Sequence, residues 1–123
     1  MLGAPFVDVL DSVRESGTSN LSPRHVGRLL GMDLLSLAEL TKVHHSTLRT
    51  HPESPTLQSA LVDLMRVVSV AVAVQRDQQR AIFLIKNAPI PAFRHKTLLQ
   101  LMQEGRTEDA QGYLDSISGG AVG

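Results

Sequence analysis

The stretch from Pro55 to Gln75 constrains the fold more strongly than any other part of this 123-residue sequence. It follows Ser54, which can cap the first turn of a helix, and Pro55 fits the first helical position. Leu57 and Leu61 begin one apolar stripe at helical spacing, and further along the apolar surface covers nearly the whole circumference. Because such a helix has to be buried, we expect residues 55–75 to lie in the core or in an oligomer interface.

The longest apolar run, from Val67 to Val74, is interrupted only by Ser69. It is much shorter than the roughly 20 apolar residues that a membrane span needs. The first residues lack a basic region before an apolar one, so no signal peptide is evident. We therefore expect no membrane partner and a cytoplasmic protein.

Composition favours an all-α fold. Aromatic residues make up 3% of the chain and hydrophobic residues 42%, so the core must consist of Leu, Val, Ile, Met and Ala. Such a core suits packing of helix on helix better than a β-sandwich or barrel. We predict a helix-turn-helix bundle at 1–54, the long helix at 55–75, and a small C-terminal helical domain with a flexible tail at 76–123. Besides the long helix, we expect a helix opening at Pro5 and helices over 23–30, 37–43, 46–50, 76–86, 96–103 and 108–118.

A short helix, a tight turn and a second short helix are predicted before Pro52. The turn is Val43-His44-His45, and the second helix runs from Ser46 to Thr50 with Leu48 pointing inward. It stops there because the residue before a proline avoids helical geometry. This is the outline of a helix-turn-helix, which places side chains in the major groove of DNA. The candidate DNA-binding residues are His44, His45, Ser46, Thr47, Arg49 and Thr50.

The overall charge counts against strong DNA binding, since DNA-binding proteins usually carry a basic excess. The chain has 12 Lys and Arg against 12 Asp and Glu, and its first 60 residues carry five basic and six acidic side chains. DNA affinity would need a local basic patch, a dimer or a partner chain. Protonation of His44, His45 and His51 would add positive charge, which predicts stronger DNA binding at lower pH.

No arrangement of residues typical of catalysis stands out. The sequence has no glycine-rich phosphate loop, no paired carboxylates and no Ser-His-Asp pattern. The absence of Cys excludes disulfides and thiolate metal sites, and adjacent His44 and His45 on a helix would point in different directions. We therefore expect no metal, no cofactor and a binding protein instead of an enzyme.

Several short motifs are together more specific than the composition. The first is LAELTKVHHSTLRTHPESPTLQ over residues 37–58. After Arg80 come AIF at 81–83, APIPAF at 88–93, KTLLQL at 96–101, EGR at 104–106, YL at 113–114 and SGG at 118–120. From about Ser22 onward the chain resembles the Xre/MbcA/ParS-type antitoxins, with residues 37–58 similar to their helix-turn-helix and the part after Arg80 similar to their toxin-binding domain.

The resemblance implies a two-part antitoxin. Its N-terminal helices would bind operator DNA and autoregulate the operon, and its C-terminal domain would bind a RES-domain toxin, an enzyme that degrades NAD. The C-terminal end would block the entrance to the toxin's active site, and a homodimer would form through the helix at 55–75. The toxin-binding residues implied by position are Arg94, His95, Tyr113, Ser116, Gly119, Gly120, Ala121, Val122 and Gly123.

The chain also departs from this family. Phe83 stands where the family often has Trp, Arg94-His95 follow Phe93 where glycine is usual, and Val122 is smaller than the usual residue near the end. Two alternatives stay open from the residues themselves. One is a stand-alone helix-turn-helix transcriptional regulator, and the other is a helical interaction module without DNA binding.

Overall fold

The structure, a computed structural model, describes residues 4–118 and is all-helical over that range. The prediction of an all-α fold is confirmed. The tail from Gly119 to Gly123, where five of the implied toxin-binding residues fall, lies outside the described residues. The elements are α1 (Ala4–Ser12), α2 (Pro23–Leu30), α3 (Leu34–Thr41), α4 (His45–Thr50), α5 (Pro55–Gln75), α6 (Gln78–Asn87), the 3₁₀ helix η1 (Pro91–Phe93), α7 (Leu98–Gln103) and α8 (Thr107–Ser118).

Serine caps and prolines start two of the helices where the sequence predicts them. The Ser22 hydroxyl accepts a hydrogen bond from the His25 backbone N–H at the start of α2, and the Ser54 hydroxyl accepts one from Leu57 at the start of α5. Gly31 ends α2 with a left-handed φ of 67°, a conformation that glycine adopts without a steric penalty.

Other boundaries differ from the prediction because residues other than glycine adopt left-handed backbone. Arg76 ends α5 with φ 58°, and Asp77 then caps α6, so α6 begins at Gln78 instead of residue 76. Lys42 ends α3 with φ 62°, which places His45 in α4 and not in the turn. After α6 the chain forms the 3₁₀ helix η1, in a segment that lies outside the predicted helices.

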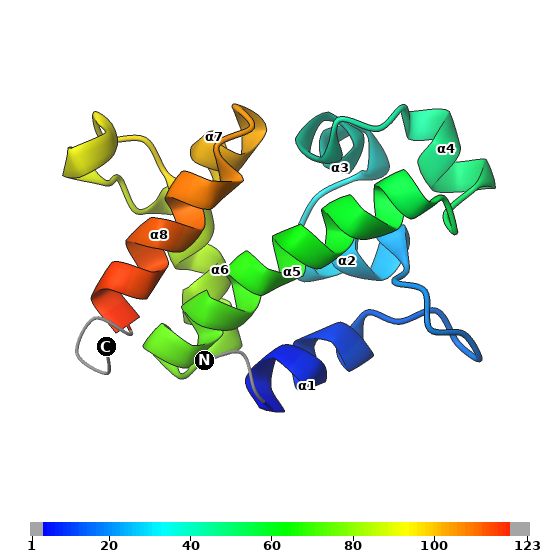
Figure 1. Cartoon of the computed structure of the whole chain (residues 1–123), viewed down its shortest axis with the longest axis horizontal. Coiled ribbons are helices and arrows are strands. Elements are labelled where there is room, and N and C mark those ends of the chain that lie inside the picture. Colours follow the sequence, from blue (N-terminus) through cyan, green and yellow to red (C-terminus); the bar gives the residue numbers. More distant parts are fainter. Residues whose placement is uncertain (1–3, 119–123) are drawn as a thin grey trace.

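The long helix α5 organises the molecule (Figure 1). It packs against α1, α6 and α8, with α3 and α4 near its first turns. Its buried side chains are Leu57, Leu61, Leu64, Met65, Val67, Val68, Ser69 and Ala71. The exposed side of α5 carries Thr56, Ser59, Asp63 and Arg66. Packing within one chain thus buries part of its apolar circumference, while Ala73 is exposed. The homodimer through this helix stays a prediction.

By length and composition alone α5 would also pass as a membrane-crossing helix. The core helix of a soluble protein passes the same test, and 44% of the most apolar window of α5 is buried inside the protein.

Polar contacts join α2 and the end of α3 to α6 and α7. The Lys86 ammonium donates to the Leu30 carbonyl at 2.9 Å, and that of Lys42 donates to the Gln103 carbonyl at 2.5 Å. Core residues come from all three predicted regions, from Val26 in α2 to Leu114 in α8. The regions therefore share one hydrophobic core.

Candidate nucleic-acid interface

The pair α3–α4 forms the predicted helix-turn-helix segment. The two helices pack against each other, and the Leu48 side chain is buried at 3% exposure. Asp33 caps α3 by accepting a hydrogen bond from the Ser36 backbone N–H at 2.8 Å. That hydrogen bond lowers the pKa of Asp33 from its ordinary value, so the carboxylate stays ionised where the helix dipole favours negative charge.

The exposed face of α4 is polar. Ser46, Arg49 and Thr50 are exposed, while His45 and Thr47 are half-buried. The Thr50 hydroxyl donates to the Ser46 carbonyl at 2.7 Å, which leaves its lone pairs for an external donor. These side chains offer the donors and acceptors that contact phosphates and base edges.

His44 precedes α4 as its N-cap residue. Its Nδ1 accepts a hydrogen bond from the Ser46 backbone N–H at 3.2 Å and lies 2.8 Å from the Ser46 hydroxyl oxygen. The rings of His44 and His45 are stacked, with centroids 4.6 Å apart. At the other end of the helix, His51 lies 3.6 Å from a Glu53 carboxylate oxygen. The three clustered histidines therefore have different surroundings.

Sequence reasoning missed two arginines on α2, the helix that precedes α3. Arg24 and Arg28 are both exposed on α2, and their spacing of four residues puts them on one side of that helix. Neither they nor Arg49 form an ion pair among the described residues. The four-residue spacing of these arginines, on a helix whose Ser22 cap the sequence shows, is the feature from which they could have been predicted.

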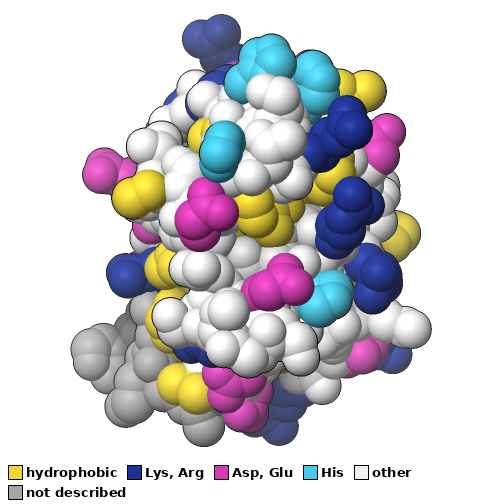
Figure 2. All heavy atoms as spheres, turned by 90° about the vertical axis from the view of Figure 1, so that its right-hand side faces the viewer, with side chains coloured by type: hydrophobic (Ala, Val, Ile, Leu, Met, Phe, Trp, Pro, Cys, Tyr) yellow, Lys and Arg dark blue, Asp and Glu magenta, His cyan; other side chains and the backbone are white. Residues whose placement is uncertain are grey.

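Figure 2 looks at the end of the molecule that carries α3 and α4. Histidine side chains gather in its upper part, and Lys and Arg side chains follow one edge below them. Acidic side chains lie on the same face. Although the net charge of the chain is zero, Lys and Arg side chains thus form a row on the face that carries the helix-turn-helix.

The implied toxin-binding residues that the structure describes lie in the C-terminal part. Arg94 and His95 are exposed and have consecutive left-handed φ values of 57° and 66°. Both residues thus adopt backbone in the region that favours glycine. Tyr113 is half-buried, and the exposed Ser116 donates from its hydroxyl to the Tyr113 carbonyl at 2.6 Å.

Polar contacts fix the chain around α7. The Lys96 ammonium donates to both carboxylate oxygens of Glu104, at 2.6 and 2.8 Å. This hydrogen bonding lowers the pKa of Glu104 from its ordinary value, and the charge of Arg106 adds to the effect. The Arg106 guanidinium also lies 5.3 Å from the centre of the Phe93 ring.

Phe83 is the most exposed large hydrophobic side chain on the described surface, at 67% exposure. It lies on α6, beside a hollow of about 660 Å³ that Arg80 and Leu84 also line. The sequence comparison noted Phe83 only as a departure from Trp and did not include it among the binding residues.

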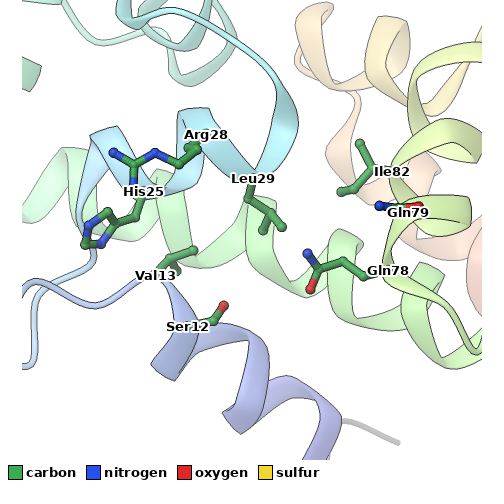
Figure 3. Close-up of a pocket in the computed structure, with 8 residues that line it drawn as sticks. All are labelled: Ser12, Val13, His25, Arg28, Leu29, Gln78, Gln79 and Ile82. Carbon is green, nitrogen blue, oxygen red and sulfur yellow. The ribbon is translucent and has the colours of Figure 1, made fainter.

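A groove of about 610 Å³ lies between α1, α2 and α6 (Figure 3). Leu29 and Ile82 face each other across it, and His25 lies at one end. The Ser12 hydroxyl donates to the Val9 carbonyl at 2.7 Å and not to His25, so the groove holds no nucleophile paired with a base. Among residues 4–118, no three His, Asp or Glu side chains are grouped to hold a metal ion.

Comparison of the chain with protein-family models, with curated proteins and with solved structures gave no match.

Proposed function

We propose that this chain is an antitoxin that binds operator DNA through α3–α4 and neutralises a RES-domain, NAD-degrading toxin through its C-terminal part. It would repress its own operon and block the toxin's active site with the tail. The observation that carries the DNA half is the polar face of α4, which exposes Ser46, Arg49 and Thr50 while Leu48 anchors the helix in the core.

The arginines of α2 support the DNA half further. In helix-turn-helix proteins the second helix, here α4, enters the major groove and the first, here α3, crosses the phosphate backbone. The helix α2 packs against α3. Arg24 and Arg28 are exposed without an ion-pair partner among the described residues. They would supply phosphate contacts and so offset the neutral charge of the chain.

The arrangement of the helices supports two separate partners. Along the long axis of the molecule, α4 lies at one end, and η1 and α8 lie toward the other (Figure 1). The exposed Phe83 belongs to the C-terminal part as well. A toxin docked there would leave α4 accessible, so we expect a ternary complex with DNA.

The DNA half is tested with a labelled fragment from upstream of the chain's own reading frame. Arg49→Ala should weaken binding about tenfold and leave toxin binding unchanged, whereas the exposed Arg80→Ala in α6 should leave DNA binding unchanged. Wild-type affinity should fall as salt rises. Binding that is absent or insensitive to salt would favour the helical interaction module, which the neutral charge also favours.

The toxin half is tested by co-expression with the neighbouring reading frame while cellular NAD is followed. The neighbour alone should deplete NAD, and the full chain should restore it. Removal of residues 119–123 should release the toxin while the complex still co-purifies. If NAD never changes and the proteins do not co-purify, the chain is a DNA-binding regulator without a toxin.

A further inference from the structure

The His44 side chain has a structural task at the start of α4. Ser46 is the second residue of this helix, so its backbone N–H is a first-turn donor without a partner inside the helix. The His44 Nδ1 accepts that hydrogen bond at 3.2 Å. His44 thus does with a ring nitrogen what Ser54 and Thr97 do with hydroxyl oxygens at the starts of α5 and α7.

This contact requires one protonation state of the imidazole. A ring nitrogen accepts a hydrogen bond only when it carries no proton, so the neutral ring must hold its proton on Nε2. A second proton turns Nδ1 into a donor, which the Ser46 hydroxyl oxygen at 2.8 Å can accept. The Ser46 backbone N–H then loses its partner, and a positive charge stands at the positive end of the helix dipole.

Few charged groups surround this ring. On α4 itself the stacked His45 would add a like charge if it were protonated too, and Arg49 lies one turn further along. From α3, the helix packed against α4, Glu39 lines the same surface hollow as His44 and His45. Lys42, between the two helices, directs its ammonium to the Gln103 carbonyl at 2.5 Å. Glu39 is therefore the one acidic side chain among these neighbours.

We infer that His44 is a positioning residue for α4 and that its protonation releases the start of this helix. The released turn carries Ser46 and precedes Arg49, so the helix that presents them loosens as the pH falls. This opposes the expectation from charge alone, which predicts stronger DNA binding at lower pH. The effect on α4 is independent of any ligand, whereas its consequence for DNA rests on the proposed function.

The test is NMR spectroscopy of the full-length chain with ¹⁵N and ¹³C labels. At pH 8 the ring nitrogens of His44 should report the Nε2–H tautomer. Between pH 8 and pH 5, the Cα shifts of residues 45–50 should move toward coil values as His44 titrates. Loss of an N-cap corresponds to about a fivefold change in the equilibrium between the closed and open first turn.

Three variants separate the cap from general charge effects. His44→Asn keeps a good cap that does not titrate, so the shifts of α4 should not change with pH. His44→Ala should show a loosened first turn at every pH. His45→Asn removes the neighbouring charge and should respond like the wild type. A pH response in His44→Asn equal to that of the wild type, or an Nδ1–H tautomer at pH 8, would overturn the inference.

DNA affinity measured at pH 8 and pH 5.5 separates this inference from the proposed function. On acidification the wild type should lose about fivefold in affinity relative to His44→Asn, because only the wild type loses its cap. If no variant binds the upstream fragment but the NMR response is present, DNA binding is wrong and the cap inference stands. If the affinities of both proteins change equally between pH 8 and pH 5.5, the cap does not control DNA binding.

Discussion

The Gln58 side chain joins three backbone groups from two separate loops to α5. Its Oε1 accepts from the Leu21 N–H at 2.8 Å, and its Nε2 donates to the carbonyls of Leu21 and Pro52 at 2.9 and 2.7 Å. Removing this amide would leave the partly buried groups without partners. We expect Gln58→Ala to lower the free energy of unfolding by about 2–4 kcal/mol, measured by urea denaturation.

The exposed Gln79→Ala is the matched control and should change stability by less than about 0.5 kcal/mol. Equal effects of the two substitutions would mean that the amide of Gln58 does not hold the loops in solution. The sequence shows Gln58 only as a polar residue on a helix. Its partners lie 37 and 6 residues away in the chain, and a single sequence does not reveal such pairings.

Glu104 should make part of the stability of the protein dependent on pH. Its pKa is lowered from the ordinary value of 4.5, chiefly by the hydrogen bond from Lys96. A lowered folded-state pKa means that this contribution is present above the unfolded-state value and is lost as the pH falls through the folded-state value. In urea denaturation between pH 6 and pH 3, Glu104→Gln should therefore lose less stability on acidification than the wild type.

Glu108→Gln, at another exposed glutamate, controls for the loss of a negative charge and should follow the wild-type profile. If Glu104→Gln follows the wild-type profile too, the ion pair with Lys96 does not form in solution. Sequence analysis placed Lys96 at the start of a helix over 96–103, whereas Thr97 caps α7 and the helix begins at Leu98; it did not connect Lys96 with Glu104. The two meet because the Ile90–Lys96 turn brings Lys96 back toward the end of α7.

At the level of helices, signals encoded in local sequence were predictable. The Ser54-Pro55 cap and the apolar pattern gave the bounds of α5, and Leu48 was expected to be buried, which it is. The ends set by left-handed arginine and lysine residues were not predictable. Left-handed backbone has a steric cost for these residues because they carry a Cβ. Their side chains give no local signal that predicts this conformation.

Arg76 allows a test of that steric cost. It is exposed and ends α5 with φ 58°, a position where glycine has no Cβ penalty. We expect Arg76→Gly to raise the free energy of unfolding by about 0.5–1 kcal/mol. Arg80→Gly, inside α6, should instead lower it by about 1 kcal/mol. Destabilisation by both substitutions would show that Arg76 is held by contacts that outweigh the strain.

At the level of the whole molecule, the sequence suggested three regions and the structure joins them in one core. The candidate DNA interface could be predicted because α3 and α4 are local in sequence. Arg24 and Arg28 were missed because they lie on α2, outside the predicted helix-turn-helix, and α2 meets α3 only through the packing of the fold. The surface around Phe83 was missed for a related reason, since periodicity does not tell which apolar residues a fold leaves uncovered.

Because the helices share one core, we expect a destabilising substitution in α8 to lower the stability of the helices at the other end of the molecule as well. Leu114 in α8 is fully buried, and α8 packs on α5, so Leu114→Ala should cost about 2–4 kcal/mol. Native-state hydrogen exchange should then show that amides of α2, α3 and α7 lose protection together. Ile117→Ala, on the same helix at 46% exposure, should cost less than about 1 kcal/mol. If Leu114→Ala lowers the protection of α7 and α8 while α2 and α3 keep theirs, the two ends of the molecule unfold independently. In that case a toxin bound at one end could not stabilise the DNA-binding helices at the other end through the core.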